Sequence, residues 1–149
     1  MLYKLSSFIL LSLLFTSFTM PSESSGSLIL EMDNIKTDHG IIWVGIYDSE
    51  ENYMVKSNAI VEGFDVTETG KLEVSFPDLE FGTYAIAIFH DLNSNGELDK
   101  NVLGIPSEPY AFSTKPKSKW RVPRFNDVKF DFNQNGQRLN TKLDKWKDQ

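Results

Sequence analysis

The sequence predicts an all-β protein with the architecture of an antiparallel β-sandwich of about seven strands. Three observations lead to this fold class. Short segments alternate apolar and polar residues with a period of two, they are rich in β-branched and aromatic residues, and clusters of Gly, Asn, Asp or Pro separate them. The chain beyond residue 27 has no stretch with convincing helical amphipathicity, so helices are not expected to build the core.

The expected elements follow one another at short intervals. Segments 40–48 and 82–90 are almost wholly apolar, as expected of central strands that are covered on both faces. The other expected strands alternate, and clusters at 67–70 and 78–82 indicate turns. In chain order, the expected strands lie within 27–34, 40–48, 58–68, 71–76, 82–90 and 127–132, with room for one helical turn in 49–58. This arrangement is typical of sandwiches of the transthyretin or immunoglobulin type.

The N-terminus has the features of a secretory signal peptide. Lys4 supplies a basic start, and residues 5–18 form an apolar core that is short for a membrane span. We therefore expect a leader at 1–24, cleaved between positions 19 and 27, and one exported domain at 27–144, in the periplasm or outside the cell. An uncleaved N-terminal anchor is the alternative. After cleavage no transmembrane span is expected.

Composition narrows the possible partners of that domain. The 149-residue chain has a formal net charge of −6 and no cysteine. An acidic exported domain is poorly suited to nucleic acid or to anionic membrane surfaces, and it suits cations better. Without disulfides, the hydrophobic core or a bound ion must stabilise the fold. The partner is therefore expected to be a protein or a small molecule.

Residues 101–124 form a segment of a different kind, because prolines recur among aromatic residues. Proline lacks the N–H group that a central strand needs, so we expect a long ordered loop or crossover. Its aromatic residues could line a ligand surface or simply pack the loop; they are Tyr110, Phe112 and Trp120. The basic run at 115–124 could meet a phosphate or an acidic glycan, or it could be a solvated face.

Polar residues recur at every second position just after the apolar segment 82–90. Positions 1, 3, 5, 6, 7 and 9 of an EF-hand-type calcium loop are filled by Asp91, Asn93, Asn95, Gly96, Glu97 and Asp99. Position 12 is Val102, which cannot ligate, so a closing carboxylate would have to come from elsewhere, and Glu108 is the nearest candidate. The sequence therefore predicts a calcium site whose ligands are Asp91, Asn93, Asn95, Asp99 and the carbonyl of Glu97, with His90 and Glu108 as possible additions.

The same residues also suit a simple turn, because Asn and Asp tolerate left-handed backbone and Asn-Gly is a favoured turn pair. Residues 131–136 repeat the pattern D-x-N-x-N-G, but Gln137 and Leu139 stand at the next two ligand positions. A single carboxylate makes calcium affinity poor. We therefore interpret the second copy as a hairpin turn at Asn135-Gly136. The first copy keeps Asp99, which a turn alone would not require.

Groups suited to catalysis are sparse. His90 and Asp91 are neighbours in an expected strand, so their side chains should point to opposite faces and not form a catalytic dyad. The chain has no cysteine and no G-x-S-x-G motif. We therefore expect a non-enzymatic protein without catalytic residues. Two alternatives stay open, namely a secreted hydrolase that uses His90 and Glu108, and a carrier of small apolar ligands that uses the aromatic loop.

Residues 76–113, "FPDLEFGTYAIAIFHDLNSNGELDKNVLGIPSEPYAFS", resemble the central signature of a bacterial exported family, the domain of unknown function 2141 family. Departures occur at Ala111, where the family usually has glycine, and at Glu80-Phe81, where a proline is common. The resemblance implies a β-sandwich similar to prealbumin-like domains and to calcium-binding B-type repeats of bacterial surfaces. It implies an exported binding or envelope-associated module with a structural calcium loop at 91–99, and no particular enzymatic activity.

Overall fold

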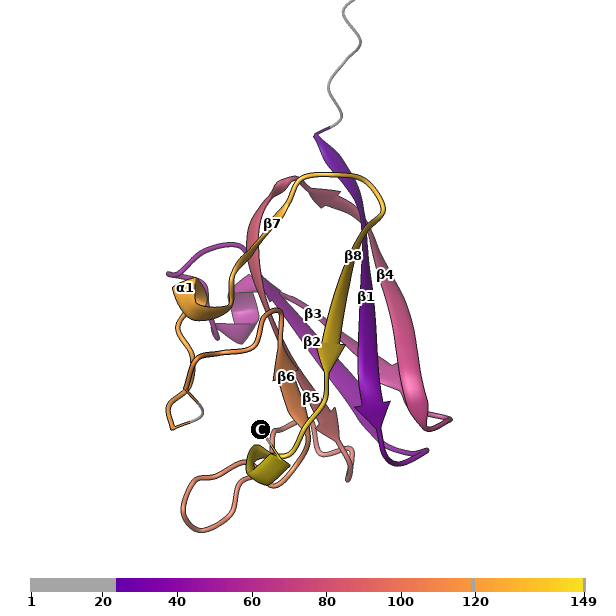
Figure 1. Ribbon diagram of the computed structural model, residues 1–149, viewed down its shortest axis with the longest axis vertical. Helices are drawn as coiled ribbons and strands as arrows, with labels where there is room; N and C mark the ends of the chain where they lie inside the picture. Colours follow the sequence, from indigo (N-terminus) through magenta and orange to yellow (C-terminus); the bar gives the residue numbers. More distant parts are fainter. Residues whose placement is uncertain (1–23, 119, 149) are drawn as a thin grey trace, which may run out of the picture.

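The computed structural model describes residues 24–118 and 120–148, so the leader expected at 1–24 lies outside the described residues except for its last position. Two β-sheets face each other as a sandwich (Figure 1), which confirms the expected all-β class. No helix among the described residues is long and apolar enough to cross a membrane. The strands are β1 (Ser25–Ile35), β2 (Ile41–Tyr47), β3 (Ile60–Asp65), β4 (Gly70–Glu80), β5 (Gly82–Asp91), β6 (Tyr110–Phe112), β7 (Phe130–Phe132) and β8 (Gln137–Lys142). The helical turns are η1 (Lys56–Asn58), α1 (Phe125–Val128) and η2 (Trp146–Asp148).

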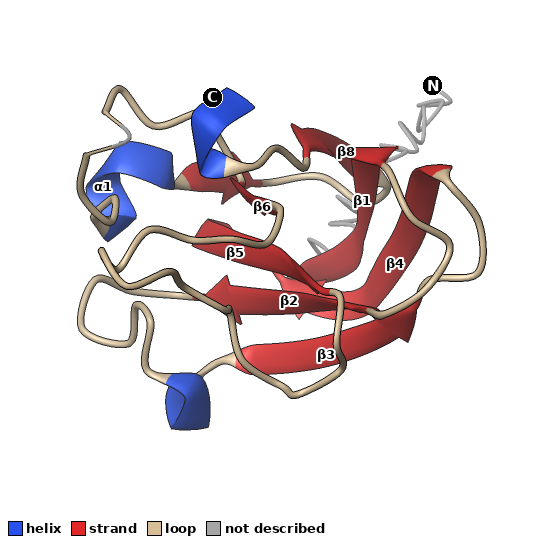
Figure 2. Ribbon diagram, turned by 90° about the horizontal axis from the view of Figure 1, so that it is seen from below, coloured by secondary structure: helices blue, strands red, loops and turns tan. Residues whose placement is uncertain are grey.

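The two sheets differ in size and in strand direction. One sheet has the order β4-β1-β8, and the other has the order β3-β2-β5-β6 with β7 paired to β5. Figure 2 shows β3, β2 and β5 side by side in one sheet and β4, β1 and β8 in the other. β1 and β8 run parallel, whereas the other strand pairs are antiparallel. The expected antiparallel sandwich is therefore correct except at this one pair.

The core lies between the sheets and follows the period-two pattern of the strands. β1 buries Leu28, Leu30 and Met32 completely, and these side chains share one cluster with Ile42 and Ile86 of the opposite sheet. Burial of each such side chain contributes roughly 1.5–3 kcal/mol to folding. Because the chain has no cysteine, this cluster supplies the main stabilising term.

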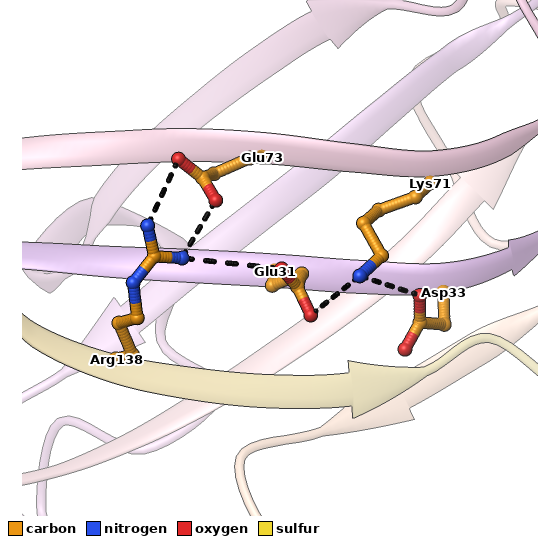
Figure 3. Close-up of polar contacts among 5 residues, drawn as sticks. All are labelled: Glu31, Asp33, Lys71, Glu73 and Arg138. Atoms are coloured by element: carbon orange, nitrogen blue, oxygen red, sulfur yellow. Dashed lines mark hydrogen bonds and ion pairs between the residues drawn. The ribbon is translucent and has the colours of Figure 1, made fainter.

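The outer face of the three-stranded sheet carries a network of charges (Figure 3). Glu31 and Glu73 lie opposite each other in the β1–β4 register, which alone would be destabilising. Arg138 lies 2.7 Å from Glu73 and 3.9 Å from Glu31, and Lys71 lies 2.9 Å from Glu31 and 3.7 Å from Asp33. The hydrogen bond from Arg138 lowers the pKa of Glu73, and the hydrogen bond to Glu31 raises the pKa of Lys71. Because charged side chains cover it, the outer face of the three-stranded sheet is exposed to solvent.

The outer face of the five-stranded sheet is apolar instead. β2 and β5 are apolar on both faces, as their sequences predict for central strands. A second small cluster covers part of this outer face, where Ala85 packs with Phe125 and Val128 and where Tyr53 and Phe112 add partly buried rings. Loops and short elements thus gather on this side of the molecule, with α1 at its edge (Figure 1).

Two expected segments take a different form in the structure. The segment 127–132 divides into the end of α1 and the short strand β7, since Val128 is buried against Phe125 rather than in the main core. The segment 101–124 is not wholly a loop, because it contains β6 at the edge of the five-stranded sheet. Pro109 comes directly before β6, and an edge position tolerates it. The helical turn expected in 49–58 is present as η1.

The second D-x-N-x-N-G copy forms a turn, as expected, but not a hairpin. β7 pairs with β5, whereas β8 pairs with β1, so residues 133–136 carry the chain from one sheet to the other. The Asn135 side chain accepts the Ser27 N–H group at 2.9 Å, and the Gly136 N–H group donates to the Ser27 carbonyl at 2.8 Å. The hairpin interpretation is therefore wrong, because contacts with β1 and not strand pairing across the turn hold this segment.

The first testable prediction concerns Ser113, a buried serine that joins three elements. Its hydroxyl accepts the N–H group of Ile86 at 3.0 Å and donates to the carbonyl of Val128. Ser113→Ala should leave both backbone groups unpaired and lower the free energy of unfolding by about 2 kcal/mol in urea titrations. Ser107→Ala, at an exposed serine, is the control and should change it little. Equal stability of the two variants would contradict the role of Ser113.

Candidate functional site

The acidic loop at 91–99 begins where β5 ends, and strand alternation separates its first two polar side chains. His90 pairs in register with the core residue Ile42, and its ring Nε2 lies 2.8 Å from the carbonyl oxygen of His39. Asp91 points to the other face of the sheet, where the indole of Trp43 reaches it. The two side chains therefore form no dyad, as the sequence predicts. His90 is buried, and its ring nitrogen has a structural partner.

Asp91 is completely buried, it has no cationic partner among the described residues, and hydrogen-bond donors surround its carboxylate. It accepts the N–H groups of Gly96 at 2.7 Å and Asn95 at 3.1 Å, and the indole N–H of Trp43 at 3.2 Å. Burial alone would raise the pKa of Asp91, but these hydrogen bonds outweigh burial and hold the pKa below its usual value. Asp91 is therefore ionised at neutral pH and organises the loop from inside.

The backbone around Asp91 needs glycine at two positions. A side chain at Gly40 would place its Cβ atom 2.4 Å from the carbonyl oxygen of Asp91, closer than any real contact. Gly40 and Gly96 have φ angles of 89° and 82°, a region in which glycine carries no steric cost. Gly96 thus makes the sharp turn that the loop pattern predicts, whereas nothing in that pattern pointed to Gly40.

Glu108 closes the loop, although not in the way that the calcium pattern suggested. This carboxylate is 4% exposed, and its two oxygens accept the N–H groups of Leu92 at 2.8 Å and Asp99 at 2.9 Å. The loop therefore begins and ends on one carboxylate from the proline-rich segment. Both oxygens of Glu108 bind protein N–H groups.

The other predicted ligands converge on Asp99. The side-chain amides of Asn93 and Asn95 donate to its two carboxylate oxygens at 2.8 Å and 3.1 Å. The side-chain oxygens of the same two residues accept the N–H groups of Asn95 and Glu97. The Glu97 side chain is exposed. The part of the chain that the structure describes contains no group of three or more His, Cys, Asp or Glu side chains that could hold a metal ion.

A groove runs beside the acidic loop, over the outer face of the five-stranded sheet. It consists of two adjoining hollows of about 760 Å³ and about 380 Å³. The two hollows share five lining residues, which are Met54, Leu98, Lys100, Tyr110 and Phe112. Volumes of this size lie in the range of about 300–1,000 Å³ that is usual for small-ligand sites.

The predicted aromatic surface lies along this groove. Tyr110 and Phe112 of β6 pack edge to face with ring centroids 5.9 Å apart, and both line the larger hollow. Trp120 lines it from the proline-rich segment, is 79% exposed, and lies 5.2 Å from the ring of Trp146. Trp43 lines the smaller hollow and also donates to Asp91, so one side chain touches both the acidic loop and the groove.

Several residues that line the groove belong to no sequence motif. Met54, Lys100 and Trp146 lie in separate segments that no motif connects, and the fold alone brings them to one hollow. The one available signal was the apolar outward face of segments 40–48 and 82–90. That face required a cover, and the groove is the part that the loops leave open.

The alternative pair of catalytic groups, His90 and Glu108, receives no geometric support. The ring of His90 bonds to the His39 carbonyl, and the Glu108 carboxylate bonds to two backbone N–H groups. Both side chains are nearly inaccessible to solvent. A general acid or base must reach a substrate, so both residues are better explained as structural groups.

The second testable prediction concerns the pH dependence of the Asp91 contribution. Because its pKa is lower in the folded state, Asp91 stabilises the fold above the unfolded value near 3.8, and this contribution is lost as the pH falls through the folded pKa. In EDTA, Asp91→Asn should cost about 3 kcal/mol of unfolding free energy at pH 7, and the difference from wild type should shrink below about pH 4. Asp131→Asn, at the exposed aspartate of the second copy, is the control. A difference that grows on acidification would contradict this role.

No curated protein and no solved structure matches the chain. One family does match, and its description is "uncharacterized protein conserved in bacteria". The match spans residues 30–140, from within β1 to within β8, and so includes the acidic loop, Glu108 and most of the groove. The matched region covers well over half of the 149 residues, and the chain therefore belongs to this bacterial family, DUF2141.

Proposed function

We propose that the protein is an exported binding module that holds a small apolar ligand in the groove beside β5 and β6. One observation carries the proposal, namely that the acidic loop and the groove share a wall. Leu98 and Lys100, just inside and just after the loop, line both hollows together with the rings of β6. The acidic loop is then a structural support for a binding surface, and not itself a reaction centre.

The exposure of apolar side chains around the groove supports a binding role. Leu103, Trp120 and Val122 line the larger hollow and are 78%, 79% and 67% exposed. Soluble proteins rarely leave large apolar side chains gathered in one exposed place unless that place binds something. The buried His90 and Glu108, in contrast, offer no accessible group for hydrolysis. Binding therefore accounts for more of the site than catalysis does.

Export is the second part of the proposal and depends on the sequence before residue 25. The basic start and short apolar core of the leader are typical of secretory signals. The ligand would then be met in the periplasm or outside the cell, in an envelope-associated or secreted role. Because the chain has no cysteine, the apolar core and the buried hydrogen bonds must hold the fold in that setting.

We further propose that calcium, or a similar hard cation, stabilises the loop through Asp91, Asn93, Asn95, Asp99 and the carbonyl of Glu97. The spacing of these oxygen-bearing residues supports this site, and the structure brings Asn93 and Asn95 into contact with Asp99. Both amides present nitrogen to Asp99, so a cation would require them to turn and present oxygen. That turn would break the hydrogen bonds that their oxygens accept from the backbone. With few carboxylates as ligands, affinity is expected near about 1 mM, as in weak extracellular modules.

The third prediction tests the groove with a neutral apolar fluorophore, N-phenyl-1-naphthylamine. Trp43, Trp120 and Trp146, the three tryptophans of the chain, all line the hollows, so bound probe should quench their emission by energy transfer. Met54→Glu should weaken saturable binding at least about tenfold, because it places a charge where both hollows meet. Ile60→Glu, at an exposed apolar residue that lines neither hollow, is the matched control. Absence of saturable binding by wild type would refute the proposed function.

The fourth prediction concerns calcium. Raising calcium from zero (in EDTA) to about 10 mM should stabilise wild type by about 1.4 kcal/mol if the dissociation constant is about 1 mM, which corresponds to about 4 °C in Tm. Asp99→Asn should abolish this rise. Asp131→Asn changes the first aspartate of the second copy, which corresponds to Asp91, and should retain the rise. An unchanged Tm of wild type would show that calcium does not stabilise the fold, and an equal rise in Asp99→Asn would show that calcium binds elsewhere. Either result would contradict the proposed site.

A further inference from the structure

We infer that the ligand of the groove is a single-chain amphiphile with an anionic head group, such as a fatty-acid carboxylate, and that Lys100 meets this head group. The inference rests on the proposed binding function and adds the chemical class of the ligand. Three features support the inference. They are the ordered apolar tip at 101–105 on one wall of the larger hollow, the positive sign of the charges that line this hollow, and the negative charge of the whole chain.

The apolar wall is formed in advance of binding. Asn101 organises the tip at 101–105, where its side-chain oxygen accepts the N–H groups of Leu103 at 2.9 Å and Ile105 at 3.1 Å. Backbone bonds join Asn101 to Ile105 and to Gly104 at 2.9 Å each. This ordered tip nevertheless leaves Leu103, which lines the larger hollow, exposed to solvent. A rigid apolar wall of this kind suits an alkyl chain, since little conformational entropy is lost on binding.

The charges along the larger hollow are all positive among the described residues. Its charged lining side chains are Lys100 and Arg121, in a chain whose formal net charge is −6. Arg121 lies 2.7 Å from the carboxylate of Asp127 and is therefore compensated. Lys100 has no ion-pair partner in the described part of the chain, and it lines both hollows. An anionic head group would complete this arrangement.

The smaller hollow does not offer an equally favourable place for an anion. Lys56 lines it, but its ammonium group lies 5.7 Å from the centre of the Trp43 ring and has a cation–π contact there. The carboxylate-bearing Glu97 lines the same hollow. A head group at Lys100 with its alkyl chain along Leu103 and Trp120 therefore fits the larger hollow best.

An anionic membrane surface shares this chemistry but is a poorer occupant. The larger hollow is a concave space of about 760 Å³ with mostly apolar walls, which a single ligand can occupy. A bilayer would also face the negative charge of the whole protein at short range, and that charge opposes approach to anionic lipid. A single amphiphile interacts only with the local positive charge.

The test compares three ligands that each carry a ten-carbon chain, at concentrations below micelle formation, by displacement of bound N-phenyl-1-naphthylamine. Decanoate should displace the probe from wild type at a concentration at least about tenfold lower than decyltrimethylammonium does. Lys100→Gln should lower the ratio of decanoate affinity to decanol affinity about tenfold, and Lys100→Glu should reverse the preference between the two charged ligands. Lys117→Gln removes a charge of the proline-rich segment that lies outside the lining of the larger hollow, and it should leave the ratio unchanged.

The outcomes separate the ligand class from the binding function. If the probe and decanol bind but Lys100→Gln and Lys117→Gln shift the ratio equally, or neither shifts it, the inference about the head group is wrong and the binding function stands. If neither the probe nor decanol binds wild type, both fail. Co-sedimentation with phosphatidylglycerol vesicles without any uptake of decanoate would also overturn the inference, in favour of a membrane.

Discussion

Two buried carboxylates, Asp91 and Glu108, impose the constraint on which the site depends. A buried charge is costly unless polar partners surround it, and no cationic side chain pairs with either one in the described chain. Their partners are N–H groups of the loop backbone, with the indole of Trp43 in addition. Each carboxylate needs those N–H groups at hydrogen-bonding distance, so the hydrogen bonds favour a single backbone conformation of the loop. As a consequence, the hydrogen bonds also hold in place the wall that the loop forms along the groove.

The two outer faces of the sandwich differ in polarity, and this difference determines where a ligand can bind. The outer face of the three-stranded sheet holds paired charges such as Arg138 with Glu73, and charged side chains of this kind are normally exposed to water. The outer face of the five-stranded sheet is apolar along β2 and β5, and so it needs a cover. Tyr110 of β6, together with the loops that carry Met54 and Trp120, supplies that cover incompletely. The proposed ligand would fill the part that they leave open.

The sequence was informative where a pattern is local and less so where the fold joins distant segments. Period-two segments predicted the core strands, and D-x-N-x-N-G predicted a sharp turn at Gly96. The same six-residue pattern at 131–136 was indistinguishable from a hairpin, because only its contact with Ser27 reveals that it crosses between sheets. β8 and its parallel pairing with β1 depend on that crossing. The role of Glu108 as an acceptor for loop N–H groups likewise depends on chain path, since spacing alone suggested a metal ligand.

The most direct test of this account is backbone hydrogen exchange measured by NMR in EDTA. If the buried carboxylates hold the loop, the amides of Leu92, Gly96 and Asp99 should be protected in wild type although they lie in a loop. Glu108→Gln should lower protection at Leu92 and Asp99 more than about tenfold, while the matched variant Glu97→Gln and the amides of β2 keep theirs. Unprotected loop amides in wild type, or equal protection in the two variants, would contradict it.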